Sequence, residues 1–285
     1  MIPFDWTEPA TLKDAVALLD PDNPTIRPIA GGTALMLMMK AGVFMPSRLV
    51  SLAKIESRYS EIRIDAEGVL RVGAMASLSQ LEQSTEAMAR FAVMKGALRT
   101  LSNVRVRNVA RIGGALAHGD PHMDLPPLLA ALGARVSVTG QRGTREIAVE
   151  DLYAGYYETT LEKNELIAEA IVPALNGAKA AYMKVTSRSA DDWPALNIGV
   201  RLETDGPAHI REARIIISAA TEKVTRLKDT EKLMTGTVVN DVLLKRAGDA
   251  AIGEVSFLSD AHGSAAYKRE LLRVYLARVI REALS

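Results

Sequence analysis

Two pairs of adjacent glycines, Gly31-Gly32 and Gly113-Gly114, are the residues best suited to hold an anionic ligand, and apolar sequence follows each pair. Because glycine lacks a β-carbon, it adopts positive φ and lets backbone N–H groups approach a phosphate closely. Two such loops suggest two contacts to one long anionic ligand, although a lone diglycine is more often a tight turn. Neither pair fits G-x-G-x-x-G or G-x-x-x-x-G-K-[ST], so a Rossmann or P-loop nucleotide site is not supported.

The segment from His118 to Asp124 carries two imidazoles and two carboxylates within seven residues, a composition that could ligate a metal. The two histidines would share a face only in a helix, and Gly119 and Pro121 disfavour a helix here. We therefore expect a polar loop without a metal, in which Asp124 caps a following helix.

A third polar cluster begins at Lys184 and ends at Trp193, which lies between Asp192 and Pro194. A solvated loop is the default interpretation. An indole is costly to expose, however, and its face could stack on a planar heterocycle. A serine hydrolase has little support, because the serines near His262 show no G-x-S-x-G motif.

The composition narrows the class of protein. The chain has 285 residues, a net charge of +1 and 48% hydrophobic residues, which is ordinary globular composition and disfavours nucleic-acid binding. The absence of cysteine excludes disulfides, a thiolate nucleophile, and any zinc site or iron–sulfur cluster held by cysteines of this chain. The amino terminus does not resemble a signal peptide, and the apolar run 30–39 is too short to span a membrane. We expect a cytoplasmic protein with no membrane span.

The hydrophobic pattern predicts alternating strands and helices in the first part of the chain. A strand over 26–30 enters the first glycine pair, and a buried helix over 34–39 leaves it. Further elements are strands over 49–52, 69–72 and 135–139, a helix over 87–101 and an apolar helix through Leu132. Asn176-Gly177 marks a domain boundary.

The second part of the chain reads as a meander followed by helices. Strands are expected over 182–185, 198–202 and 213–218, and helical sequence from about Lys228. In the last helix, apolar residues from Leu272 to Ala283 recur at i, i+3 and i+4, with Lys268 and several arginines largely on the opposite side. This helix should lie across the second sheet.

Nine segments carry a family resemblance that covers almost the whole chain: Ala30-Gly31-Gly32-Thr33, Val72-Gly73-Ala74, Val104-Arg105-Val106-Arg107-Asn108, Ile112-Gly113-Gly114, Leu116-Ala117-His118-Gly119-Asp120-Pro121, Asp124-Leu125-Pro126-Pro127, Tyr182-x-Lys184, Asp191-Asp192-Trp193 and Tyr267-Lys268-Arg269. In this order they resemble the FAD-binding medium subunit of molybdenum hydroxylases, the xanthine dehydrogenase and aerobic carbon monoxide dehydrogenase family.

The resemblance implies an α+β fold. A two-lobed FAD-binding domain of the vanillyl-alcohol-oxidase (PCMH) type would span 1–175, with lobes of about 1–55 and 56–175. A C-terminal antiparallel sheet with packed helices would span 176–285. The chain would be the oxidoreductase subunit that takes electrons from a partner iron–sulfur small subunit and passes them to an external acceptor. A molybdenum-cofactor large subunit would be the second partner, in a dimer of heterotrimers.

The resemblance also implies cofactor-binding residues. Residues 29–35 and 112–114 would hold the pyrophosphate, Asp124 the ribityl or ribose, and Trp193 would cover the flavin ring. The full set is Ile29, Ala30, Gly31, Gly32, Thr33, Ala34, Leu35, Ala76, Leu101, Arg111, Ile112, Gly113, Gly114, Ala117, His118, Asp120, Asp124, Ile167, Lys184 and Trp193. No catalytic and no metal-binding residue is implied.

Two positions depart from the family pattern, since Arg111 and Ala115 replace the usual Thr and Asn or Asp around Ile-Gly-Gly. Arg111 could contact a phosphate or point to solvent. The departures leave open an assembly protein of the same fold without FAD. A self-contained flavin oxidase is a second alternative, although such enzymes carry a larger substrate domain.

Overall fold

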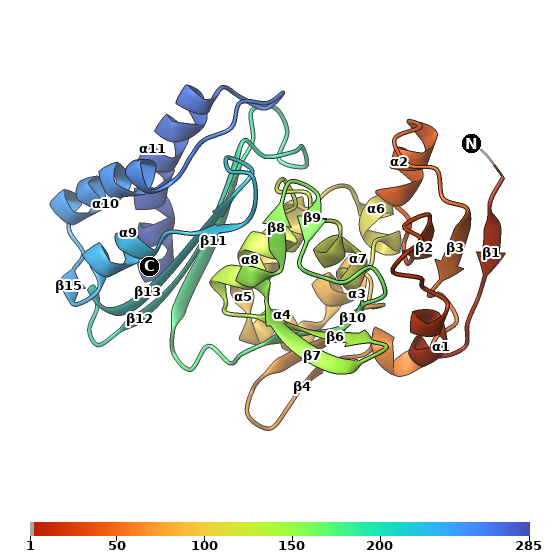
Figure 1. Cartoon of the computed structure of the whole chain (residues 1–285). Coiled ribbons are helices and arrows are strands. Elements are labelled where there is room, and N and C mark those ends of the chain that lie inside the picture. Colours follow the sequence, from red (N-terminus) through yellow and green to blue (C-terminus); the bar gives the residue numbers. More distant parts are fainter. Residues whose placement is uncertain (1–2) are drawn as a thin grey trace.

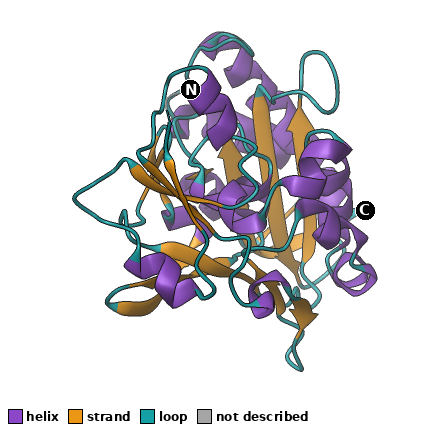
Figure 2. Cartoon of the chain, turned by 90° about the vertical axis from the view of Figure 1, so that its right-hand side faces the viewer, coloured by secondary structure: helices purple, strands orange, loops and turns teal. Residues whose placement is uncertain are grey.

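The computed structural model describes residues 3–285, in which three sheets of three or more strands follow one another along the molecule (Figure 1). The first is a small parallel sheet with the order β1-β3-β2. Its elements are β1 (Asp5–Thr7), α1 (Leu12–Ala17), β2 (Ile26–Ile29), α2 (Leu35–Lys40) and β3 (Arg48–Ser51). Figure 2 looks onto this lobe from the right-hand side of Figure 1.

The middle sheet is antiparallel, with the order β4-β5-β10-β6-β7. Its strands are β4 (Ile62–Ile64), β5 (Leu70–Gly73), β6 (Arg135–Gly140), β7 (Gly143–Ala148) and β10 (Leu166–Val172). The helices inserted between β5 and β6 are α3 (Leu78–Gln83), α4 (Thr85–Arg90), α5 (Ala92–Thr100), α6 (Val104–Val109), α7 (Ile112–Ala117) and α8 (Leu125–Ala131). A hairpin of β8 (Tyr153–Gly155) and β9 (Glu158–Thr159) and two short 3-10 helices, η1 (Ser57–Ser60) and η2 (Val149–Asp151), complete this part.

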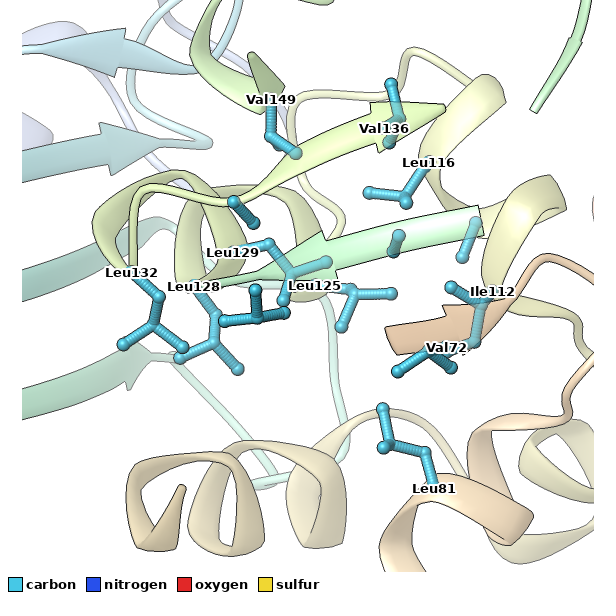
Figure 3. Packing of buried hydrophobic residues seen from close by; sticks show 14 of the residues in the cluster. Val72, Leu81, Ile112, Leu116, Leu125, Leu128, Leu129, Leu132, Val136 and Val149 are labelled. Carbon is cyan, nitrogen blue, oxygen red and sulfur yellow. The ribbon is translucent and has the colours of Figure 1, made fainter. Parts of the chain in front are cut away.

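The core of the middle part forms between this sheet and its helices (Figure 3). Leucines of α8 and α7 meet valines of β5 and β6, and Leu125, Leu116 and Val136 are fully buried. α8 is apolar on all sides because it is also covered from the other direction, by β12 and β13 of the third sheet. The helix therefore belongs to both cores.

The third sheet has the order β11-β12-β13-β14, with β15 pairing β13. Its elements are β11 (Lys179–Val185), β12 (Leu196–Thr204), β13 (His209–Ser218), β14 (Thr225–Arg226), α9 (Lys228–Met234), β15 (Thr237–Val238), α10 (Asp241–Glu254) and α11 (Ala265–Leu284). As predicted, the last helix lies across this sheet and packs on β11 and β12. The observed mixture of sheets and helices confirms the predicted α+β class.

Two helix predictions were wrong in detail. The helix expected over 87–101 is interrupted at Phe91, whose φ of −124° and ψ of 61° separate α4 from α5 while its ring is buried. The helix expected to be buried over 34–39 buries only Met39, and Leu37 is 66% exposed. A six-residue helix on a three-stranded sheet has only one face to cover, so its other apolar residues are half-buried or, in the case of Leu37, exposed.

Within residues 3–285, no helix combines the length and the apolarity that a bilayer crossing requires.

Candidate functional site

The first glycine pair forms an open row of backbone donors between β2 and α2. Gly32 has a φ of +68°, which favours glycine. The N–H groups of residues 31–35 donate no hydrogen bond to any atom of residues 3–285, although the carbonyl of Gly32 accepts one from Met36. Successive N–H groups without acceptors are what an anionic diphosphate needs.

The two glycines of the second pair differ in their surroundings. The Gly113 N–H donates to Ala74 O at 2.8 Å, and a β-carbon on Gly113 would lie 2.7 Å from the Ala74 β-carbon. Gly114, in contrast, is exposed, and a β-carbon there would meet only Ala30, at 3.9 Å. Gly113 is therefore required for close packing, and Gly114 faces open space.

The two glycine loops adjoin each other. A β-carbon on Gly31 would lie 2.2 Å from the carbonyl oxygen of Val109, so only glycine fits beside the turn that leads into α7. Ala30 lies next to Gly114 across the same junction. The fold therefore brings the two loops side by side.

One face of α7 continues the site beyond Gly114. Gly114, Ala117 and His118 follow at i, i+3 and i+4 and are exposed or half-buried, whereas Ile112 and Leu116 are buried on the other side. The His118 ring contacts Tyr157 edge-on, with ring centroids 5.1 Å apart. Burial lowers the pKa of His118 and outweighs the opposing effect of Asp120, so this imidazole is neutral at pH 7.

Asp124 occupies the N-cap position of α8 as expected, but its side chain makes no capping hydrogen bond there. Its carboxylate instead accepts hydrogen bonds from Lys184 Nζ at 3.0 Å and from the Tyr182 hydroxyl at 3.1 Å. Lys184 also donates to Thr100 O at 3.0 Å. Burial raises the pKa of Asp124 to about 6, and the Lys184 charge limits the rise. The pair joins the start of α8 to β11 and provides polar groups in an otherwise apolar region.

Trp193 lies in the loop between β11 and β12 and is 45% exposed. The edge contact between its ring and His122, with centroids 6.1 Å apart, leaves an aromatic surface accessible. Such a surface can stack on a planar ring.

Other predicted site residues are buried or engaged elsewhere. Ile29, Ala76, Leu101 and Ile167 belong to the hydrophobic cores and can contribute only walls. The guanidinium of Arg111 donates a hydrogen bond to Met75 O at 3.1 Å. Arg111 therefore does not simply point to solvent, and not all of its N–H groups are available to a phosphate.

Sequence reasoning missed part of a polar cluster near the His118–Asp124 loop. Lys268 was expected on the solvent side of the last helix, but it is fully buried and donates to Ala219 O at 2.7 Å. Tyr157 donates from its hydroxyl to Asp120 Oδ2 at 2.8 Å. Neither Tyr157 nor Asp260, the acidic partner of Lys268, has a local sequence signal, because Tyr157 contacts Asp120, 37 positions away, and Asp260 contacts His122, 138 positions away.

Taken together, these residues fit FAD. The free N–H groups of residues 31–35 and of Gly114 match a diphosphate, the Asp124–Lys184 pair offers polar contacts, and Trp193 offers a stacking surface.

Comparison with known proteins agrees with this fit. Residues 2–175 match the family "FAD binding domain in molybdopterin dehydrogenase", and residues 181–283 match "CO dehydrogenase flavoprotein C-terminal domain". The chain is 31% identical to the carbon monoxide dehydrogenase medium chain of Afipia carboxidovorans, over 99% of this chain and 98% of that one. It is 28% identical to the glyceraldehyde dehydrogenase medium chain of Sulfolobus acidocaldarius, over 98% of each.

The solved structures agree. The crystal structure of the cyanide-inactivated Cu,Mo-CO dehydrogenase superposes with a TM-score of 0.93 at 30% identity, covering 100% of this chain and 99% of that chain. The open glycine loops, the aromatic surface and both family matches thus lead to one assignment: the chain belongs to the FAD-binding medium subunits of the molybdenum hydroxylases, and is an oxidoreductase subunit.

Proposed function

We propose that this chain takes electrons from a partner iron–sulfur subunit and passes them to an external acceptor. The observation that carries the proposal is the junction of the two glycine loops, where residues 31–35 and Gly114 present N–H groups without acceptors. FAD, when bound, supplies the redox chemistry. The residues of this chain bind the cofactor, orient it and set its electrostatic surroundings.

The glycine loops would hold the diphosphate. Their N–H dipoles are fixed by the backbone, so they need no reorganisation when an anion arrives. The exposed face of α7 would continue along the cofactor from Gly114 to His118. Because His118 is neutral and partly buried, it can donate or accept one hydrogen bond there without adding charge.

Asp124 and Lys184 would hold polar groups of the ribityl or ribose portion. The two side chains are almost completely buried and already paired, so they are held in fixed positions before the cofactor binds. Trp193 would cover one face of the isoalloxazine, and Ile167 would pack beside the adenine or the flavin.

The other redox centres of the complex would belong to partner subunits. With no cysteine, this chain cannot hold an iron–sulfur cluster through cysteine ligands. The relatives carry the names "medium chain" and "medium subunit", which fits a complex with a large molybdenum-cofactor subunit and a small iron–sulfur subunit. We further propose a dimer of such heterotrimers, with the FAD-binding domain at 1–175 and the second domain at 176–285.

The visible absorbance spectrum of the purified chain tests the proposal. The chain is incubated with FAD or with FMN, desalted and then reduced with dithionite. We expect FAD to be retained and reducible, and FMN to be lost, because only FAD carries a diphosphate for the glycine loops. If neither flavin is retained, even after co-expression with the partner subunits, the electron-transfer role is wrong and an assembly protein without FAD takes its place.

A further inference from the structure

Four charged side chains meet where the FAD-binding part of the chain touches the C-terminal sheet. His122 lies in the α7–α8 loop, and its two ring nitrogens are each 2.9 Å from a carboxylate, Nδ1 from Asp120 and Nε2 from Asp260. Asp260, in the segment before α11, also pairs with the buried ammonium of Lys268. The cluster therefore connects residues more than one hundred positions apart.

The geometry requires a charged imidazole. An ionised carboxylate only accepts hydrogen bonds, so an imidazole with a carboxylate at each nitrogen satisfies both only when both nitrogens carry a proton. The two acids are held ionised by other donors, Asp120 by the Tyr157 hydroxyl and Asp260 by Lys268. With His122 protonated, two positive and two negative charges balance.

The pKa directions agree with this charge state. Burial by itself would lower the pKa of His122, but the hydrogen bonds to Asp120 and Asp260 outweigh it and raise the pKa. Burial would raise the pKa of Asp260, yet the hydrogen bonds from Lys268 and His122 lower it to about 2.

Two strained residues fasten the loop that carries His122. Tyr157 and Ala219 have φ values of +59° and +66°, uncommon for residues other than glycine. Tyr157 N–H donates to Gly119 O and Ala219 N–H donates to Pro121 O, each at 2.9 Å. The carbonyl of Ala219 accepts from Lys268. Such strain persists only where surrounding contacts enforce it, and it gathers at functional sites.

His122 also contacts the aromatic side chain that would face the cofactor. Its ring meets the Trp193 ring edge-on, with centroids 6.1 Å apart and planes at 89°. Tyr156 meets His122 from the β8–β9 hairpin at 6.4 Å, and His262 from the loop before α11 at 5.1 Å. His122 is therefore the point at which the Trp193 loop, the hairpin and the C-terminal loop converge.

We propose that His122 is a positioning residue that joins the two parts of the chain through Asp120 and Asp260 and fixes Trp193 at the cofactor site. The role of Trp193 toward the flavin rests on the function proposed above, whereas the contact between His122 and Trp193 does not.

Loss of the His122 proton would release this arrangement. The titratable groups that face His122 are Asp120 on its own loop, Asp260 and His262 before α11, Lys268 on α11 and Tyr156 on the hairpin. A neutral imidazole turns one lone pair toward a carboxylate, and the cluster gains a net negative charge. The contact that holds Trp193 then weakens.

Fluorescence of the chain without FAD tests this. Trp6→Phe leaves Trp193 as the single tryptophan, since the sequence has two. A protonated imidazole quenches a neighbouring indole, so the emission of Trp193 should rise with pH, with a midpoint above the ordinary histidine pKa of about 6.5. The anisotropy of Trp193 should fall across the same step. In Trp6→Phe/His122→Gln, the step should disappear and the anisotropy should be low at every pH.

His262→Gln in the same background is the matched control, because it removes the neighbouring imidazole and keeps both bonds of His122. The step should persist there. A midpoint at or below 6.5, a step that survives His122→Gln, or a step lost in His262→Gln would each overturn the proposal.

If circular dichroism finds His122→Gln unfolded, Asp260→Asn replaces it and should lower the midpoint; an unchanged midpoint overturns the proposal. No outcome depends on FAD, so a failure here is distinct from a failure of the proposed function.

Discussion

At the scale of single residues, Gly114 is the position where an added side chain should weaken FAD binding without disturbing the fold. Its added β-carbon would meet only Ala30, at 3.9 Å, and its N–H has no acceptor within residues 3–285. We expect Gly114→Val to lower the affinity for FAD roughly tenfold or more, the loss of about 1.4 kcal/mol of binding free energy. FAD titration followed by flavin fluorescence measures this.

Gly96→Val is the control for that experiment, since Gly96 is exposed in α5 and an added β-carbon meets nothing within 4 Å. It should bind FAD as the unsubstituted chain does. If Gly114→Val keeps full affinity, Gly114 is not part of the cofactor site.

The buried pair Asp124–Lys184 should matter for stability as well as for binding. Asp124→Asn leaves the Lys184 ammonium buried without its counter-charge, which typically costs about 3–5 kcal/mol. Asp124→Asn/Lys184→Met removes both charges and should recover much of that loss. Urea unfolding of the three proteins measures the free energies, and a double variant as unstable as the single one would contradict the argument.

Residue types explain which site residues the sequence could predict. The first glycine pair could be predicted because only glycine readily adopts the φ of +68° at Gly32, and because a β-carbon on Gly31 would lie 2.2 Å from Val109 O. Lys268 could not be assigned, because a lysine in an amphipathic helix normally faces water and its burial depends on Asp260 and Ala219. Pairs of that kind are set by the tertiary fold.

At the scale of elements, the crossing of α10 and α11 depends on a glycine. A β-carbon on Gly248 would lie 2.6 Å from Arg273 O, so the two helices touch at their backbones. We expect Gly248→Ala to lower the unfolding free energy by about 1–3 kcal/mol, the usual cost of overpacking. Gly96→Ala, in the open interior of α5, should raise it by about 0.5–1 kcal/mol. Thermal unfolding of both variants measures these changes, which should have opposite signs. Equal changes in unfolding free energy would contradict the close packing of α10 on α11.

Element prediction succeeded where one periodicity held throughout and failed where tertiary packing intervened. The last helix keeps its apolar stripe from Leu272 to Ala283, and its observed position follows from that stripe. The break at Phe91 has no Gly or Pro to announce it, and it coincides with the burial of the Phe91 ring in the core of the middle part. The exposure of Leu37 depends on how little sheet lies beneath α2.

At the scale of the whole molecule, the candidate site extends from the glycine loops beside the first sheet to the junction between the middle and C-terminal sheets. α8 packs on β12 so closely that a β-carbon on Gly199 would lie 2.7 Å from the Ala131 β-carbon. The Asp124–Lys184 pair and the His122–Asp260 hydrogen bond cross the same junction. The sequence predicts two parts but not these contacts, because the partners lie at least 60 residues apart.

The same junction makes the stability of the molecule depend on pH in a specific direction. The pKa of His122 is raised in the folded chain, so its contribution is complete below the unfolded value of about 6.5 and is lost as pH rises through the folded pKa. The pKa of Asp260 is lowered to about 2, so its contribution is present above about 3.8 and is lost as pH falls. Thermal unfolding should therefore show a melting temperature that declines as pH rises above 6.5, and His122→Gln should flatten that decline.

His209→Gln serves as the control: His209 also has a raised pKa, but its ion pair with Asp205 is exposed and contributes little. If the decline in melting temperature persists in His122→Gln and vanishes in His209→Gln, the loss of stability at high pH comes from the exposed His209–Asp205 pair and not from the junction.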